Sequence, residues 1–260
     1  GSLWLPFLFY LGKKESGVSR NGIFCHPSVS QKARPGGPVT DQENPMFRYL
    51  SIVLAALGLS LSVSACAQED HARFAADTHY RLLDKPVAVN DPGKIEVREF
   101  FFYGCPHCYD TEPLIEHWLT SKPEDVDFVR SPVLFINGAE PLARAFYVAQ
   151  SKGILDQVHK PIFDAIHKHR EPLFTVPALT NFFRKYGVEP KEFNELYASF
   201  GVSTRIRQAD AVSRESRISG VPAFTVNGKY VVLRQNLKSA NELFEVIDFL
   251  VEKERKARGG

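Results

Sequence analysis

The sequence predicts an α/β domain, because stretches typical of buried strands alternate with stretches of helical periodicity. Residues 94–104 are rich in β-branched and aromatic residues, and the apolar residues between Leu114 and Leu119 then recur at helical spacing. Further helical stretches follow, and an Asn-Gly pair marks a hairpin near the end. With 260 residues, 44% of them hydrophobic, the chain can build a sizeable core in one large or two small domains.

The first 67 residues are predicted to lie outside this domain. Residues 46–67 begin at the only methionine and continue with one arginine, an uncharged apolar run and small residues, which is the order of a secretory signal. The apolar run is shorter than the roughly 20 residues that a transmembrane helix needs. Residues 1–45 show no sustained period, so we interpret them as an upstream segment without function. Residues 68–85 would be an N-terminal extension.

The charge balance gives no indication of a nucleic-acid partner. Beyond residue 67 the chain carries 26 Lys and Arg residues against 27 Asp and Glu residues, formally −1. A nucleic-acid surface would need Lys and Arg clustered on one face. We therefore expect no nucleic acid among the partners.

Two cysteines, Cys105 and Cys108, stand three positions apart with a proline and His107 between them. In an exported chain such a pair tends to form a disulfide. A structural disulfide is disfavoured, because a loop of two intervening residues gains little from closure. A structural zinc site needs four ligands, and no second pair follows. Three histidines are interpreted as one solvated helix face: His159, His167 and His169. The pattern favours redox chemistry without a metal or cofactor.

The pair would lie where the strand over residues 94–104 meets the following helix. Cys105 would occupy the helix N-terminus, where free N–H groups and the helix dipole stabilise an anion. A stabilised thiolate is a better leaving group. Cys108, one turn further along, would face the same side and be more covered.

The remaining elements follow in order. A second strand is predicted over residues 125–135, and residues 202–217 would lead back to the core. The stretches with helical periodicity are residues 140–153, 155–169, 175–187 and 189–201, three of which end at a glycine typical of a C-cap. The last two elements are a hairpin over 224–232 with an Asn227-Gly228 turn, and a helix over 239–256 opening with a capping box, Ser239 to Glu242.

Glu99 breaks the apolar pattern of the first strand. By the period of two it shares one face with Val97 and Phe101. Buried without a partner, a carboxylate is costly and tends to hold a proton. The alternative is a glutamate at a solvated strand end, paired with Arg98 or Arg130.

These residues resemble the DsbA-type thiol oxidoreductases of the bacterial periplasm. The resemblance covers about residues 79–255 and rests on "EFFFYGCPHCY" and, far downstream, "SGVPAFTVNGKY". The Pro-His dipeptide between the cysteines is typical of this family. The resemblance implies a thioredoxin-like fold with a helical insertion domain: residues 86–137 and 202–256 would form the thioredoxin-like domain, and residues 138–201 the insertion.

The resemblance also implies roles for single residues. Pro222, which the sequence alone would leave trans, is expected to follow Val221 through a cis peptide bond beside the cysteines and to pair with an extended substrate. Glu99 is expected beneath the cysteines, where it assists proton transfer to or from the buried thiol. His107 would donate a hydrogen bond or a positive charge to the Cys105 thiolate and so make the disulfide more oxidising.

The expected function is the introduction of disulfide bonds into reduced exported proteins by exchange at the Cys105–Cys108 pair. The resemblance implies a periplasmic monomer that is reoxidised by a quinone-linked membrane partner of DsbB type. Three alternatives stay open: a disulfide reductase or isomerase, a non-catalytic module that binds unfolded chains, and a glutathione-dependent isomerase, against which the second thiol, Cys108, argues.

The end of the signal leaves two alternatives for Cys66. "VSAC" resembles a bacterial lipobox, in which the cysteine becomes lipid-modified and N-terminal. Ordinary cleavage after Ala67 would instead leave Gln68 first. Both place the enzyme in the periplasm. We favour the lipid anchor, because a spare thiol beside an oxidant would invite mispairing; residues 67 to about 80 would then tether the domain to a membrane.

Overall fold

The computed structural model describes residues 73–259. The predictions for residues 1–45, for the signal over 46–67 and for Cys66 lie outside these residues. Within them the chain alternates strands and helices around one mixed sheet, so the α/β prediction is confirmed. No helix among the described residues has the length and apolar character needed to cross a membrane.

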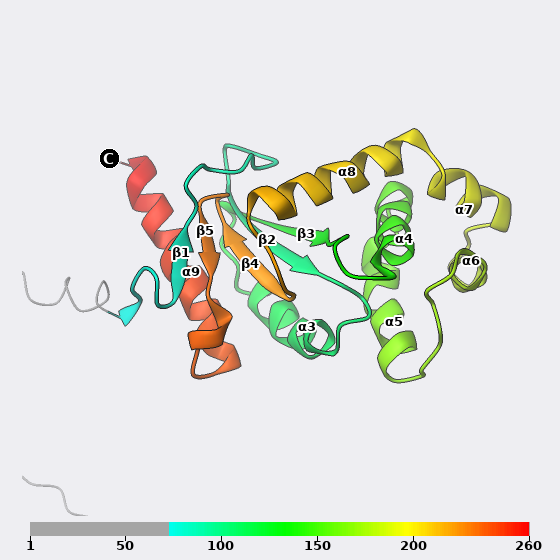
Figure 1. Cartoon of the computed structure of the whole chain (residues 1–260), viewed down its shortest axis with the longest axis horizontal. Helices are drawn as coiled ribbons and strands as arrows, with labels where there is room; N and C mark the ends of the chain where they lie inside the picture. Colours follow the sequence, from blue (N-terminus) through cyan, green and yellow to red (C-terminus); the bar gives the residue numbers. More distant parts are fainter. Residues whose placement is uncertain (1–72, 260) are drawn as a thin grey trace, which may run out of the picture. The chain divides into compact units, whose positions relative to one another are not determined.

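Five strands of the described part form the sheet, in the order β1-β5-β4-β2-β3 (Figure 1). Strands β2 and β3 are parallel, while β4 runs antiparallel to β2 and β5, and β1 is antiparallel to β5. Every residue of β2 is buried, because β2 lies between two neighbouring strands and is covered on both faces. The strands are β1 (Tyr80–Leu82), β2 (Ile95–Phe101), β3 (Val126–Pro132), β4 (Ala223–Val226) and β5 (Tyr230–Val232).

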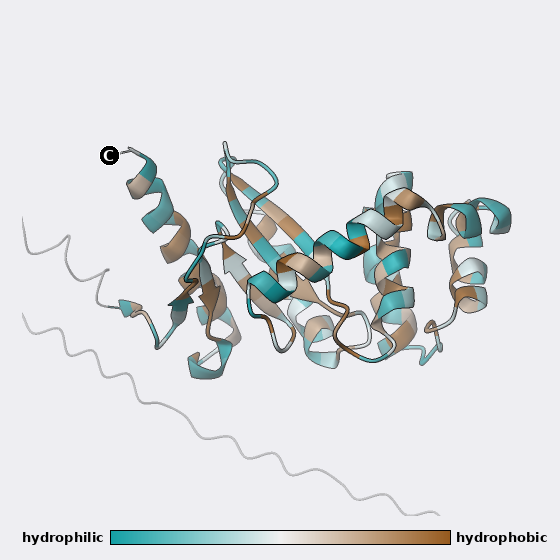
Figure 2. Cartoon of the chain, turned by 45° about the horizontal axis from the view of Figure 1, so that its top comes forward, coloured by the Kyte–Doolittle hydropathy of each residue, from teal (hydrophilic) through white to brown (hydrophobic). Residues whose placement is uncertain are grey.

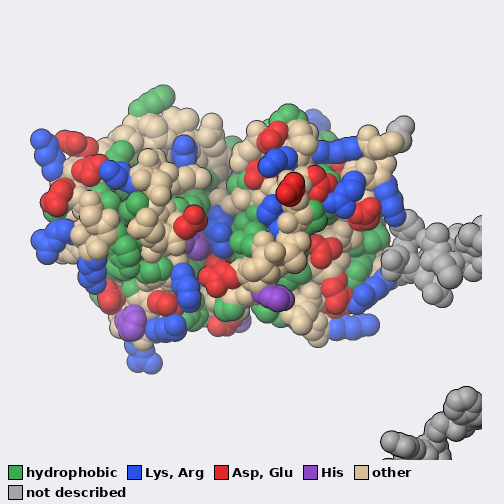
Figure 3. Space-filling model, turned by 180° about the vertical axis from the view of Figure 1, so that it is seen from behind, with side chains coloured by type: hydrophobic (Ala, Val, Ile, Leu, Met, Phe, Trp, Pro, Cys, Tyr) green, Lys and Arg blue, Asp and Glu red, His purple; other side chains and the backbone are tan. Residues whose placement is uncertain are grey.

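Helices α3 (Pro106–Leu119) and α9 (Ala240–Gly259) pack together and cover one face of the sheet. The core beneath them joins residues of the sheet such as Val97 and Phe224 to Ile115 of α3 and Leu250 of α9, all fully buried. Figure 2 shows that α9 is hydrophilic toward its C-terminal end. On the face seen in Figure 3, acidic and basic side chains are interspersed.

Five helices lie in the chain between β3 and β4, and Figure 1 shows α8 running from this helical group back to the sheet. They share a second core with the end of β2 and the residues that follow it, among them Phe101, Tyr103 and Cys108. The helices are α4 (Ala139–Lys152), α5 (Leu155–His167), α6 (Val176–Arg184), α7 (Pro190–Tyr197) and α8 (Phe200–Glu215).

The predicted helix over 189–201 is in fact two helices. The side chain of Ser199 accepts a hydrogen bond from the N–H of Val202 at 3.2 Å, and this cap starts α8 at Phe200, one residue before Gly201. Gly201 therefore lies in the first turn of α8 and does not cap α7. Gly153, in contrast, ends α4 in the left-handed conformation that its position at a C-cap predicts, with φ of 69°.

The hairpin forms as predicted, with Asn227 and Gly228 both at positive φ, 51° and 61°. Half of the capping box forms: Ser239 Oγ accepts from the Glu242 N–H at 3.2 Å, but the Glu242 carboxylate accepts from the N–H of Lys238 rather than of Ser239. Residues Tyr80–Leu82, which were expected in an N-terminal extension, form β1 and pair with β5.

Candidate active site

Cys105 is the N-cap of helix α3, at the point where the chain leaves β2. Its carbonyl oxygen accepts the first hydrogen bonds of the helix, from the N–H groups of Cys108 and Tyr109, each at 3.1 Å. Pro106 suits the first helical position, because it lacks the N–H that would have no partner there. The Cys105 sulfur thus lies at the positive end of the helix dipole, as predicted.

The two cysteines differ sharply in accessibility. Both are free thiols, but Cys105 is partly exposed while Cys108 is fully buried. Burial raises the pKa of the Cys108 thiol well above its ordinary value, and the nearby Cys105 and Glu99 raise it further. Only Cys105 can therefore be reached by a partner from solution.

The Val221–Pro222 peptide bond is cis, in agreement with the expectation from the resemblance. It lies at the start of β4, directly beside the first cysteine. Cys105 Sγ donates to the carbonyl oxygen of Val221 at 3.6 Å, across 116 positions of sequence. The fold thereby brings together the two motifs on which the resemblance rests.

Glu99 is completely buried in β2. Burial, together with repulsion from Glu112, raises its pKa to about 8 against the attraction of Arg130 and Arg234. Arg130 Nε lies 3.4 Å from Glu99 Oε2, but neither carboxyl oxygen has a hydrogen-bond partner among the described residues. The side chain is thus both buried and close to Arg130, while Arg98 pairs with Glu96 instead.

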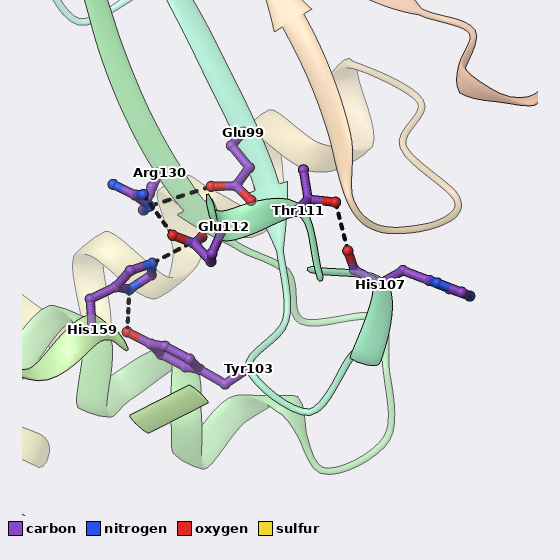
Figure 4. A network of polar contacts seen from close by, with 7 residues as sticks. All are labelled: Glu99, Tyr103, His107, Thr111, Glu112, Arg130 and His159. Carbon is purple, nitrogen blue, oxygen red and sulfur yellow. Dashed lines mark hydrogen bonds and ion pairs between the residues drawn. The ribbon is translucent and has the colours of Figure 1, made fainter. Parts of the chain in front are cut away.

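A chain of polar contacts extends from Glu99 to the helical part (Figure 4). Arg130 donates to Glu112 at 3.0 Å, Glu112 contacts His159 Nε2 at 3.2 Å, and His159 Nδ1 lies 2.7 Å from the hydroxyl of Tyr103. Burial opposes the charge on Glu112, but His159 and Arg130 outweigh it and hold its pKa below the usual value. The network joins β2, β3, α3 and α5.

The prediction that His159 belongs to a solvated helix face is wrong. Its side chain is buried, and burial lowers its pKa. The signal was present in the sequence, because His159 recurs with Val158, Ile162 and Phe163 at the spacing of an apolar face. His167 is half-buried and lies 2.8 Å from the carbonyl oxygen of Tyr103, so only His169 fits that prediction.

Glu112 was also missed, although it stands one turn after Cys108 on α3. His107 is exposed, and its imidazole points away from the buried network, while its carbonyl oxygen accepts from Thr111 Oγ1 at 2.6 Å (Figure 4). Within the described residues no group of three or more His, Cys, Asp or Glu side chains is placed to hold a metal ion.

Comparisons with known proteins agree with this geometry. Residues 96–243 match the family described as DSBA-like thioredoxin domain. The thiol:disulfide interchange protein DsbA of Burkholderia cepacia is 38% identical over 208 residues, covering 80% of this chain and 97% of that protein. DsbA of Pseudomonas aeruginosa is 37% identical over 206 residues, covering 79% and 97%.

Solved structures extend the similarity to three dimensions. The crystal structure of Pseudomonas aeruginosa DsbA matches with a TM-score of 0.69 at 37% identity, over 73% of this chain and 98% of that one. The oxidoreductase DsbA from Xylella fastidiosa matches with a TM-score of 0.64 at 31% identity, over 68% and 96%. The thioredoxin-like fold predicted from the sequence is therefore confirmed.

Proposed function

Since this chain belongs to the DsbA-like family of thiol:disulfide oxidoreductases, we propose that Cys105 and Cys108 are its redox-active pair and introduce disulfide bonds into exported proteins. The observation that carries the proposal is the contrast between the two thiols. One is accessible at a helix N-terminus beside a cis-proline, and the other is buried one turn away. Such a pair can bond to a substrate at the accessible sulfur, while the buried sulfur takes up the electron pair of the broken enzyme disulfide.

In the first step the oxidised enzyme holds a Cys105–Cys108 disulfide. A substrate thiolate attacks the accessible sulfur of Cys105, and the bond between the two enzyme sulfurs breaks. A mixed disulfide forms between substrate and Cys105. The electron pair goes to Cys108, which takes up a proton because burial disfavours its thiolate. Glu99, which holds a proton at neutral pH, is the proposed donor.

In the second step another substrate thiolate attacks the substrate sulfur of the mixed disulfide. Cys105 leaves as a thiolate, stabilised by the N-terminus of α3 and, in this proposal, by His107. Two substrate thiols have then become one disulfide, and the enzyme disulfide has become two thiols. Two electrons have passed from substrate to enzyme.

The backbone at Val221 and Pro222 is the proposed docking edge for the substrate. Cys105 Sγ contacts the Val221 carbonyl oxygen at 3.6 Å, so a peptide bonded to Cys105 lies beside this segment. An extended substrate can pair with the backbone there as an added strand. The partners are accordingly reduced exported proteins, recognised mainly through their main chain.

The reduced enzyme must be reoxidised before another turnover. We propose a quinone-linked membrane protein of DsbB type as the oxidant, the periplasm as the compartment and a monomer as the working form. A disulfide-forming enzyme fits that compartment, where disulfides form and persist.

The equilibrium constant of the enzyme disulfide against glutathione tests the proposal. We expect the constant of a strong oxidant and no oxidation of a reduced substrate by Cys105→Ser. Cys108→Ser cannot close the enzyme disulfide, so its Cys105 should accumulate as a mixed disulfide when the partner supplied is itself a disulfide, such as oxidised glutathione. A strongly reducing constant would instead indicate a reductase. Full activity of Cys105→Ser in binding unfolded chains, without any redox turnover by the parent, would indicate a non-catalytic module.

A further inference from the structure

Arg234 lies after strand β5, and its side chain reaches the cis-proline segment beside Cys105. It begins a short 3-10 helix, Arg234–Asn236, directly after β5, and its Nη1 donates to the carbonyl oxygen of Pro222 at 3.0 Å. The carbonyl of the preceding residue, Val221, is the one that Cys105 Sγ contacts. Arg234 and Cys105 therefore hold two consecutive carbonyl groups of the cis-proline segment.

The Arg234 side chain also faces the helix that carries the cysteines. Together with Thr111 and Leu114 of α3, it lines a cleft of about 300 Å³ that continues to Lys238 and Leu243 at the start of α9. Its guanidinium is half-buried. Burial lowers its pKa, and the charges of Cys108, Cys105 and Glu99 oppose that shift, which places Arg234 within electrostatic reach of both sulfurs.

Arg234 differs from Arg98 of β2 and Arg130 of β3 in forming no ion pair with a carboxylate. Arg98 pairs with Glu96 at 2.8 Å, and Arg130 pairs with Glu112 at 3.0 Å. None of the described carboxylates forms an ion pair with Arg234, whose hydrogen-bond acceptor is a neutral carbonyl. A half-buried cation without a counter-charge is unfavourable. In the reduced enzyme, however, a thiolate appears beside it.

We propose that Arg234 is a positioning residue that holds the Pro222 carbonyl and supplies the counter-charge for the Cys105 thiolate formed when the Cys105–Cys108 disulfide is reduced. This inference rests on the proposed redox role of the two cysteines. The oxidised pair carries no charge, so Arg234 gains an anionic partner only on reduction. It therefore favours the reduced enzyme and makes the disulfide a stronger oxidant.

The proton and electron balance of the exchange is unchanged by this role. In the first step the electron pair of the broken S–S bond moves to Cys108, and in the second step the electron pair of the mixed disulfide moves to Cys105. Arg234 stabilises the negative charge as it develops on each sulfur and keeps its own protons throughout, because an arginine side chain stays positively charged near neutral pH.

The test compares three variants with the parent. Arg234→Gln removes the charge, Arg234→Lys keeps it, and Lys238→Gln removes the same charge from an exposed position of the same cleft. We expect Arg234→Gln to shift the equilibrium with glutathione about tenfold toward the disulfide form, equivalent to about 30 mV. Arg234→Lys should restore most of that shift, and Lys238→Gln should stay within about twofold of the parent.

A second readout separates charge from structure. The pH profile of Cys105 alkylation should move to higher pH in Arg234→Gln and stay in place in Lys238→Gln. If the glutathione equilibrium constant and the alkylation profile of Arg234→Gln equal those of the parent, the proposal is wrong. It is also wrong if Lys238→Gln shifts them as much as Arg234→Gln does. If Arg234→Gln does not fold, the test uses Arg234→Lys, which keeps the positive charge. A tenfold shift of its glutathione equilibrium would show that the charge is not what matters, and would overturn the proposal. Each shift is measured relative to the parent protein. A parent that proves to be a weak oxidant would therefore contradict the proposed function, while the comparison between Arg234→Gln and the parent would still test the role of Arg234.

Discussion

At the scale of single residues, Glu99 shows how burial controls a proton. Its carboxyl group is fully buried, and burial with repulsion from Glu112 raises its pKa from 4.5 to about 8. Between these values the folded protein keeps the proton and the unfolded chain does not. The free energy of unfolding therefore falls as pH rises through this window, by at most about 1.4 kcal/mol per pH unit from this group.

Glu99→Gln should remove this part of the pH dependence, because the amide does not ionise. Urea unfolding of the reduced protein at pH 5, 6, 7 and 8 measures it, and the variant's stability should fall less steeply than the parent's. Glu116→Gln, at an exposed position of α3, should follow the parent. Parallel curves for Glu99→Gln and the parent would mean that Glu99 is ionised throughout and is no proton donor near pH 7.

His107 is the second residue with a proposed role, and its exposed imidazole lies in the first turn of α3 next to Cys105. His107→Ala should make the disulfide less oxidising, by roughly tenfold in the glutathione equilibrium, because the thiolate loses a donor. His117→Ala, exposed in the last turn of α3, is the control. An unchanged potential in His107→Ala would leave His107 as a plain surface residue.

At the scale of elements, the buried network joins α3 to α5. Glu112 of α3 contacts His159 of α5 at 3.2 Å, and both side chains are almost fully buried. His159→Ala should lower the free energy of unfolding by roughly 2–4 kcal/mol, because it leaves a cavity and a buried carboxylate with one partner fewer. His169→Ala, exposed just after α5, should change stability by less than about 0.5 kcal/mol. Equal effects in thermal unfolding would contradict the structural role of the network.

The turn between β4 and β5 depends on a glycine for two reasons. Gly228 has a φ of 61°, and a Cβ there would lie 2.0 Å from the carbonyl oxygen of Val87. Gly153 has a similar φ of 69° but open space around it. Both alanine variants should lose roughly 1–2 kcal/mol for the left-handed backbone, and Gly228→Ala should lose clearly more through the clash. Similar melting temperatures for the two variants would show that the Val87 segment moves aside freely.

The features that the sequence predicted correctly are those whose signal lies in a few neighbouring residues. The strand with a glutamate on its apolar face, the cysteine at the helix start and the Asn-Gly turn all follow from neighbouring residues, and all are found. The contacts of His159 and Arg234 join segments far apart in the chain, and a single polar residue in a helix or after a strand gives no sign of its partner. The break before α8 was missed, because Ser199 caps a helix inside a stretch that reads as continuous.

At the scale of the described domain, helix α3 lies between the two hydrophobic cores. Ile115 and Trp118 belong to the core under the sheet, while Cys108 at the other end of the helix belongs to the core of the helical part. The exposed thiol is therefore held at the junction by packing from both sides. This explains how a short motif can keep one sulfur in solvent and the other fully buried.

The last prediction concerns where the whole molecule resides. We propose that Cys66 is lipid-modified and anchors the domain to a membrane, as the resemblance of "VSAC" to a lipobox suggests. The tether predicted over residues 67 to about 80 cannot extend as far as 80, because Arg73 pairs with Glu245 and the buried side chain of Phe74 packs against Phe249. A single acyl chain binds a membrane only weakly and reversibly, so stable anchoring through Cys66 requires more than one chain on that cysteine.

Fractionation of bacteria expressing the chain from Met46 tests the anchor. The parent should sediment with membranes, and Cys66→Ala should appear in the soluble periplasmic fraction with Gln68 as its first residue, because ordinary cleavage after Ala67 then takes over. Release of both proteins by osmotic shock, each beginning at Gln68, would exclude the lipid anchor. It would leave the redox chemistry untouched, because Cys105 and Cys108 lie in the folded domain that both forms share.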